Sequence, residues 1–232
     1  MRLFAKDFSR MIDVSAVKTE DSESEVRRMA ETAAENGCAA VFALPHFTPL
    51  AIELLKGHPE VAPGGAVGFP SGGQTTKIKV AETRELIAMG CTEIDMVISI
   101  GRLISGRRAE VLDDIKAVVA ESGKLPVKVI LECHYLTMDQ IRIGCDLVVE
   151  GGGSWVKTST GLAPTGATLE NIAIIKKQVG DACGVKAAGG VRGLETLLAM
   201  YRVGARRFGL GWKGARGILE RVRALGAEGI EV

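Results

Sequence analysis

The chain has 232 residues, of which 47% are hydrophobic and 25% are charged, so it can bury a sizeable core and stay in solution. Its 29 basic and 28 acidic side chains leave a formal net charge of +1, and both signs are mixed along the whole length. Only 4% of the residues are aromatic. This composition argues against nucleic acid or a membrane surface as a partner, because such partners favour basic stripes and stacking aromatics.

The N-terminal residues Met1 to Arg10 mix charged and apolar side chains and lack the continuous apolar segment of a signal peptide. No stretch of the sequence approaches about 18 apolar residues, the length that a membrane-spanning helix needs. Five cysteines are dispersed without a CxxC pair, a pattern typical of reduced thiols. We therefore expect a cytoplasmic protein.

Short apolar runs alternate along the chain with amphipathic stretches, several of which end in glycine, as helices often do. The expected strands are Met11–Val14, Ala39–Leu44, Ala62–Gly68, Glu93–Ile98, Val127–Glu132, Trp155–Thr158, Val185–Ala188 and Arg206–Leu210. The expected helices include Ser24–Asn36, Thr76–Met89, Arg108–Glu121, Met138–Glu150 and Leu169–Val179. These β/α repeats predict a single (β/α)8 TIM barrel domain over residues 1–232. If the first or last strand is misassigned, an open doubly wound sheet is the alternative.

Four charged side chains occupy strand positions where a core residue is expected. In the fourth expected strand, Ile94 and Met96 alternate with Asp95, so the apolar face suits the helices and Asp95 points into the barrel. The same alternation directs Lys128, Lys157 and Lys186 inward from the next three strands. Sequential β/α repeats place these strands side by side, and we expect the four side chains to converge.

Three buried ammonium groups are costly unless a partner or a function compensates for them. An amine attacks a carbonyl only when it is neutral, and a nearby cation together with burial lowers the pKa of a lysine from its usual value of about 10.4. One lysine would then be the nucleophile and a second would tune it. The structural alternative is an ion-pair cluster around Asp95, Glu132 and Asp13 that only fills the barrel.

A metal-dependent reaction is the contrasting interpretation. The sequence holds three histidines, His46, His58 and His134, and none lies at the i, i+4 spacing of a zinc site. Cys133 and His134 are adjacent, but consecutive strand residues face opposite sides. We therefore expect no catalytic metal.

Glycine-rich turns follow the last two expected strands. The first runs from Gly189 to Gly193 and contains Arg192, and the second contains Gly209 and Gly211. Barrel enzymes often bind phosphate on the loops after strands seven and eight, where glycine lets backbone N–H groups approach the anion. The position of these turns predicts a phosphate site.

Several segments resemble the deoxyribose-phosphate aldolase family. They are MID near Asp13, AVGFPSG at 66–72, EIDMVISIG at 93–101, KVILE at 128–132, VKTSTG at 156–161 and VKAAGGVR at 185–192. The resemblance implies reversible cleavage of 2-deoxy-D-ribose 5-phosphate to D-glyceraldehyde 3-phosphate and acetaldehyde, with neither metal nor organic cofactor, and it favours a homodimer. It makes Lys157 the Schiff-base lysine, Lys186 its tuning neighbour and Asp95 the proton donor and acceptor. It also places Gly161, Gly189, Gly190, Gly209 and Gly211, with Arg192, around the substrate phosphate.

The sequence departs from this family pattern at three places. Val14 and Ser15 replace a usual His-Thr pair, and Phe42 stands where many members have cysteine. Gly211 and Trp212 replace the serines of the last turn. An aldolase acting on an unphosphorylated or different aldehyde therefore stays an alternative, as do a non-catalytic barrel that binds sugar phosphates and a phosphosugar isomerase.

Overall fold

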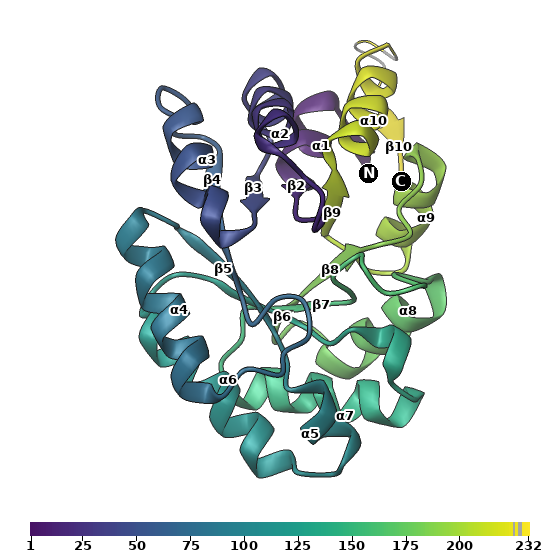
Figure 1. Cartoon of the computed structure of the whole chain (residues 1–232). Coiled ribbons are helices and arrows are strands. Elements are labelled where there is room, and N and C mark those ends of the chain that lie inside the picture. The colour runs from purple at the N-terminus through teal and green to yellow at the C-terminus, as the bar shows by residue number, and fades with distance from the viewer. Residues whose placement is uncertain (225, 227–228) are drawn as a thin grey trace.

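The computed structural model describes residues 1–224, 226 and 229–232 and shows eight parallel strands closed into a barrel (Figure 1). The barrel strands are β2 (Ile12–Ala16), β3 (Ala40–Ala43), β4 (Ala62–Val67), β5 (Glu93–Val97), β6 (Val127–Ile130), β7 (Trp155–Lys157), β8 (Gly184–Ala188) and β9 (Arg207–Gly211). The helices are α1 (Ala5–Met11), α2 (Glu23–Asn36), α3 (Thr48–Leu54), α4 (Thr76–Met89), α5 (Ile100–Ile104), α6 (Arg108–Ser122), α7 (Met138–Glu150), α8 (Leu169–Val179), α9 (Leu194–Arg202) and α10 (Trp212–Ala224). Short 3-10 turns cover Pro45–Phe47 and Cys133–Tyr135.

The barrel closes where β2 pairs with β9, with Asp13 opposite Gly209 and Ser15 opposite Gly211. Every other barrel strand pairs with the strand that follows it in sequence. The expected (β/α)8 barrel is thus confirmed, and the open sheet is excluded because it would leave β2 and β9 as edges.

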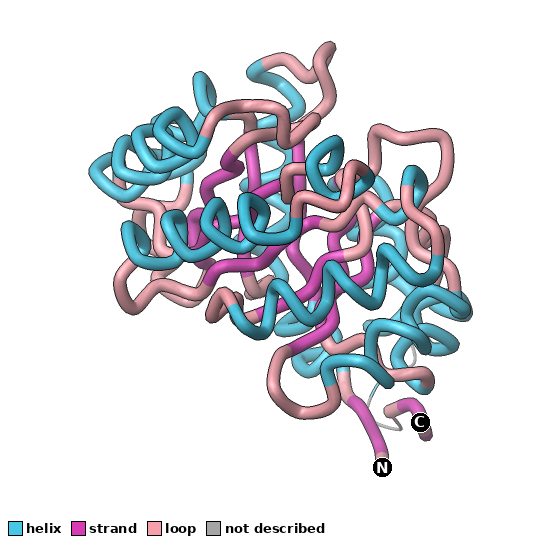
Figure 2. The backbone as a smooth tube through the Cα atoms, turned by 90° about the horizontal axis from the view of Figure 1, so that it is seen from below, coloured by secondary structure: helices cyan, strands magenta, loops and turns pink. Residues whose placement is uncertain are grey.

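The two ends of the chain meet outside the barrel. Strand β1 (Arg2–Leu3) pairs in antiparallel fashion with β10 (Ile230–Glu231), and both lie on the same side of the molecule in Figure 2. No helix within the described residues is both long enough and apolar enough to cross a membrane.

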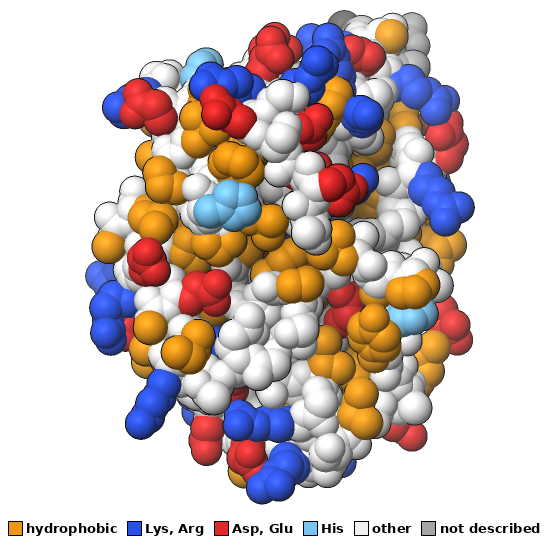
Figure 3. All heavy atoms as spheres, viewed as in Figure 1, with side chains coloured by type: hydrophobic (Ala, Val, Ile, Leu, Met, Phe, Trp, Pro, Cys, Tyr) orange, Lys and Arg blue, Asp and Glu red, His pale blue; other side chains and the backbone are white. Residues whose placement is uncertain are grey.

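The main core lies between the barrel and its helices. Ile94 and Met96 of β5 are fully buried and belong to a continuous apolar cluster that includes residues from β2, β6, β8 and the surrounding helices. The alternation of the strands leaves the other face for the barrel interior, where polar and charged side chains gather. Charged side chains of both signs are intermixed around the face shown in Figure 3, with hydrophobic side chains between them.

The expected elements agree with the observed ones to within a few residues. Helices α2, α4 and α8 end at Gly37, Gly90 and Gly180, all of which have positive φ. Strand β6 ends at Ile130, two residues before the predicted end at Glu132. Glu132 has a φ of 55°, a left-handed conformation that is incompatible with a strand. The short helices α1 and α5 were not predicted, since five to seven residues are too few to show a helical repeat.

Candidate active site

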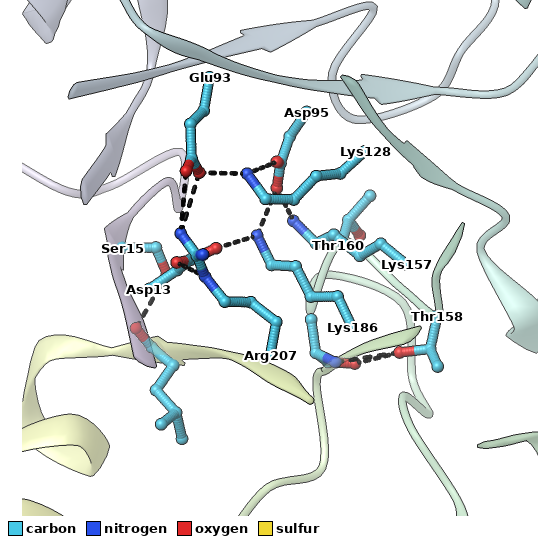
Figure 4. Close-up of polar contacts among 12 residues, drawn as sticks. Asp13, Ser15, Glu93, Asp95, Lys128, Lys157, Thr158, Thr160, Lys186 and Arg207 are labelled. Atoms are coloured by element: carbon cyan, nitrogen blue, oxygen red, sulfur yellow. Dashed lines mark hydrogen bonds and ion pairs between the residues drawn. The ribbon is translucent and has the colours of Figure 1, made fainter. Parts of the chain in front are cut away.

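Three lysines and one aspartate meet inside the barrel (Figure 4). The Nζ atoms of Lys157 and Lys186 lie 2.7 and 2.6 Å from the same atom, Oδ2 of Asp95. The Nζ of Lys128 lies 3.2 Å from the other oxygen of that carboxylate. The register explains the convergence: Asp95 of β5 pairs with Lys128 of β6, and Lys157 of β7 pairs with Lys186 of β8.

Further ionic contacts extend this cluster. Lys186 also contacts Asp13 at 2.6 Å, and Arg207 contacts Asp13 at 2.5 Å. Glu93 receives hydrogen bonds from Arg207 at 3.0 Å and from Lys128 at 2.5 Å. The barrel interior therefore holds a continuous network of alternating charges.

The network shifts the pKa values of its members. Burial alone would raise the pKa of Asp95, but the charges of Lys128, Lys157 and Lys186 outweigh it and hold that pKa well below its usual range. Burial lowers the pKa of Lys186 to about 8, although the carboxylates of Asp13 and Asp95 oppose the shift. Burial also lowers the pKa of Lys128, but the carboxylates of Asp95, Asp13 and Glu93 outweigh this effect, so the pKa is raised.

Of the seven residues in this network, strand alternation predicted four, the ion-pair alternative named Asp13, and two were missed. Glu93 lies two residues before Asp95 on β5, and Arg207 lies two residues before the inward Gly209 on β9. The same period of two places both side chains inside the barrel. Applying the alternation along the full length of each strand would have found them.

Glu132 lies outside the ionic network, so the alternative of an ion-pair cluster around Asp95, Glu132 and Asp13 does not hold for Glu132. Its carboxylate accepts hydrogen bonds from the backbone N–H of Thr160, at 3.1 Å, and from the Thr160 hydroxyl. Because Glu132 has left-handed backbone, its side chain turns toward the loop after β7. Glu132 therefore holds the segment that follows Lys157.

A cavity of about 480 Å³ opens above the network at the carboxyl ends of the strands. Asp95, Lys157 and Lys186 line its floor, and Lys157, 8% exposed, is the most accessible of the three network lysines. Its walls include Phe42, Phe69, Leu162 and Val191, and residues of the β2–α2 and β9–α10 segments line its mouth. This location is where barrel enzymes hold their substrates.

The glycines predicted to bind phosphate all line this cavity, and Arg192 does not. The lining includes Gly161, Gly189, Gly190, Gly209 and Gly211. Arg192 is exposed and is not among the residues that line the cavity.

The loops after β7 and β8 pack backbone against backbone. A Cβ at Gly166 would come within 2.3 Å of Gly189, and one at Gly190 within 2.8 Å of the Ala167 carbonyl oxygen. Gly189 and Gly190 also have positive φ values of 68° and 91°. Glycine is therefore favoured at Gly166 by space, at Gly189 by its positive φ, and at Gly190 by both.

Gly211 and Trp212 mark the end of β9 and the start of α10. Nothing lies within 4 Å of a Cβ built at Gly211, so this position is open to the cavity. Trp212 both lines the cavity and packs against the core, and the guanidinium of Arg28 lies 5.2 Å from its ring centroid. The indole therefore forms part of the cavity mouth without closing it.

The histidines do not gather at this site. His134 shares a hydrogen bond of 2.7 Å with Thr165, and His58 lies near Glu60 at the surface. Among the described residues, no group of three or more His, Cys, Asp and Glu side chains is arranged to hold a metal ion.

Comparison with known proteins agrees with this geometry. Residues 9–219 match the DeoC/LacD family aldolase. The chain belongs to this family. It is 48% identical over 205 residues to a deoxyribose-phosphate aldolase of Klebsiella pneumoniae subsp. pneumoniae, covering 88% of this chain and 82% of the relative. A deoxyribose-phosphate aldolase of Sinorhizobium medicae is 41% identical over 230 residues, with 99% and 93% coverage.

A solved structure described as QR15, an aldolase, has the same fold. It superposes with a TM-score of 0.89 at 33% identity, covering 96% of this chain and 99% of that one. The family assignment and the barrel therefore rest on sequence and structure together.

Proposed function

We propose that this protein is a deoxyribose-phosphate aldolase that cleaves 2-deoxy-D-ribose 5-phosphate through a Schiff base on Lys157. Lys186 is the neighbouring cation, and Asp95 holds both amines and relays protons. Support comes from the family membership, from the names of the relatives and from the cavity above the three side chains.

The charge balance of the network carries this proposal. Three carboxylates, Asp13, Glu93 and Asp95, are matched within the barrel by three cations, Lys128, Lys186 and Arg207. Lys157 is the amine outside this three-to-three balance, and it is the most exposed of the network lysines at the cavity floor. Lys157 is therefore the amine of the network that a carbonyl substrate in the cavity can reach and attack.

The reaction follows from this amine. The Lys157 nitrogen adds to the C1 aldehyde of the open-chain sugar, and loss of water leaves an iminium ion. The C3 hydroxyl loses its proton, the C2–C3 bond breaks, and its electron pair forms the enamine as glyceraldehyde 3-phosphate departs. Protonation at C2 and addition of water then release acetaldehyde and restore the amine.

Asp95 is suited to the proton steps because its environment changes during the cycle. In the free enzyme the three lysines hold its pKa well below the usual range. At the enamine stage the nitrogen of Lys157 is neutral, so one of these opposing charges is gone and the carboxylate becomes a better base. A water molecule between Asp95 and the substrate would complete the relay.

Borohydride trapping tests this proposal. Acetaldehyde followed by borohydride should attach an ethyl group to Lys157 and inactivate the enzyme, and peptide mass spectrometry locates the adduct. Lys157→Ala should give no adduct, while the control Lys79→Arg, which changes a buried lysine outside the cavity, should still be modified. An adduct that persists in Lys157→Ala excludes this mechanism.

A second candidate changes the acceptor and keeps the chemistry. The mouth of the cavity carries the acidic residues Glu20, Asp21 and Glu25 beside Lys18 and Lys213. Carboxylates near a phosphate are unfavourable, so this mixed rim is compatible with an unphosphorylated aldehyde. Comparing kcat/KM for 2-deoxyribose with that for its 5-phosphate separates the two candidates.

We also propose a compartment, a domain organisation and an oligomeric state for this protein. All five cysteines are free and buried, which supports a reducing compartment such as the cytoplasm. We propose one catalytic domain over residues 1–232, a sugar phosphate and an aldehyde as its ligands, and a homodimer in solution. Sedimentation velocity measures the assembly directly.

A further inference from the structure

The side chain of Thr158 binds the backbone of the strand next to it. Thr158 directly follows Lys157, the last residue of β7. Its hydroxyl donates a hydrogen bond to the carbonyl oxygen of Ala188, at 3.0 Å, and accepts one from the backbone N–H of the same residue, also at 3.0 Å (Figure 4). One side-chain oxygen therefore pairs with both polar backbone groups of Ala188, the last residue of β8.

This contact lies where the backbone pairing of the two strands stops. Thr158 still donates its N–H to the carbonyl of Lys186, at 3.0 Å, as in regular parallel pairing. If that pairing continued, the carbonyl of Thr158 would accept from the N–H of Ala188. It accepts instead from the N–H of Cys133, at 2.9 Å, in the turn after β6. The hydroxyl therefore takes the place of a backbone acceptor and pairs the two strands for one residue more.

The contact is next to the two amines of the proposed reaction. Lys157 and Lys186 are the last residues in register between β7 and β8, and both amines reach one oxygen of Asp95. Thr158 itself is fully buried and is not among the residues that line the cavity. Its hydroxyl can therefore act on the reaction only through the residues that it holds in place.

We propose that Thr158 is a positioning residue, whose hydroxyl fixes the end of β7 to the end of β8 and so keeps Lys157 and Lys186 side by side on Asp95; this inference rests on the proposed Schiff-base function of Lys157. The two hydrogen bonds to Asp95, of 2.7 and 2.6 Å, leave little room for displacement, because such bonds weaken beyond about 3.2 Å. A displacement of about 1 Å can lower the rate of an enzyme about a hundredfold.

Thr158→Val tests this role, because it removes the hydroxyl and keeps the branched shape of the side chain. The full chain is mixed with acetaldehyde and quenched with borohydride at intervals, and mass spectrometry counts the ethyl adducts on Lys157. The rate of adduct formation should fall about tenfold to a hundredfold. In the steady state kcat should also fall while KM changes little, because Thr158 does not line the cavity.

Thr158→Ser restores the hydroxyl and should recover most of the rate. Ser159→Ala is the matched control, because Ser159 is the next residue, is equally buried and has a hydroxyl without a hydrogen-bond partner among the described residues. Its rate should equal that of the wild type. A wild-type rate in Thr158→Val, an equal loss in Ser159→Ala, or no recovery in Thr158→Ser overturns the inference. If Thr158→Val does not fold, Thr158→Ala is compared with Thr158→Ser, since the two differ in the hydroxyl alone, and equal rates overturn it.

Hydrogen exchange provides an independent check of the contact. The N–H of Ala188, which is 4% exposed, should exchange faster in Thr158→Val and Thr158→Ala and be protected again in Thr158→Ser. Unchanged exchange contradicts the contact on which the inference depends. If the wild type forms no adduct with acetaldehyde, the proposed function itself fails; an adduct that forms at the wild-type rate without the hydroxyl removes only the inference about Thr158.

Discussion

Lys157 and Lys186 donate hydrogen bonds to one and the same oxygen atom, Oδ2 of Asp95, at 2.7 and 2.6 Å. The two amines are therefore held close together by a carboxylate that neither strand could supply. Lys186 also contacts Asp13, whereas Lys157 has the cavity on its other side. Lys186 is therefore held by two carboxylates, whereas Lys157 is accessible from the cavity and is the amine that we expect to react.

The charge of Lys186 should limit activity at alkaline pH. Its pKa is about 8, so the side chain is charged below that pH and loses its proton as the pH rises through it. If the proposed mechanism needs this cation, kcat should fall above about pH 8 in a pH–rate profile. Lys186→Arg stays charged, so kcat should be lower at every pH but the alkaline decline should move upward. If kcat of Lys186→Arg falls at the same pH as that of the wild type, the alkaline decline belongs to a group other than Lys186.

The same ionisation affects folding stability. The pKa of Lys186 is lower in the folded chain than its usual 10.5, so between these values the unfolded chain binds more protons. The free energy of unfolding should therefore increase as the pH rises from about 8 toward 10.5. Lys186→Met should lack this contribution when the two proteins are compared by urea unfolding across that range.

The ion pair of Lys79 and Asp114 should support the barrel wall between α4 and α6. Both side chains are fully buried and lie 2.5 Å apart, and Lys79 also donates to the carbonyl of Val97 at 2.9 Å. Lys79→Met leaves the buried carboxylate of Asp114 without its cation, and we expect the free energy of unfolding to fall by about 3–5 kcal/mol. Urea denaturation measures the change.

The exposed pair Arg84–Glu121 is the control for this experiment. The Arg84 side chain is 68% exposed, so Arg84→Met should lower the free energy of unfolding much less than Lys79→Met does. Equal losses at the two sites would show that burial does not set the contribution of these pairs.

The hydroxyl of Thr160 should matter more than that of its neighbour Ser159. Thr160→Val removes a donor from the buried carboxylate of Glu132 and should destabilise the protein by about 1–3 kcal/mol. It should also raise KM, because the loop after Lys157 loses its anchor. The buried Ser159 hydroxyl has no hydrogen-bond partner among the described residues, so Ser159→Ala should not destabilise the protein. A larger loss of stability in Ser159→Ala than in Thr160→Val would contradict the role of the Thr160 hydroxyl.

Lys213 should contribute to phosphate binding and Arg192 should not. Lys213 lines the mouth of the cavity, whereas Arg192 is exposed outside it. If the substrate carries a 5-phosphate, Lys213→Ala should raise its KM about tenfold, equivalent to one charge-assisted hydrogen bond, and the effect should shrink at high salt. Arg192→Ala should change KM less than about twofold. A large effect of Arg192→Ala would place the phosphate elsewhere.

The inward lysines were predictable because side-chain direction in a strand is a local property with a period of two. The contact of both Lys157 and Lys186 with one oxygen of Asp95 was not, because it depends on the register between strands that are far apart in sequence. Arg192 shows the opposite case. A charged side chain in a suitable motif was expected at the phosphate, but Arg192 is exposed and outside the cavity lining, and the period of two that orients strand side chains does not extend into the turn after β8.

By itself, the sequence determined the order of the elements, the faces of the strands and the family. These follow from short-range patterns and from motifs that lie within single segments. Only the tertiary structure decided that Glu93 and Arg207 complete the ionic network, that Glu132 holds Thr160, and that Phe42 occupies the space left by Gly64. Each of these depends on contacts between different strands and the loops that follow them, which the pattern within a single segment does not contain.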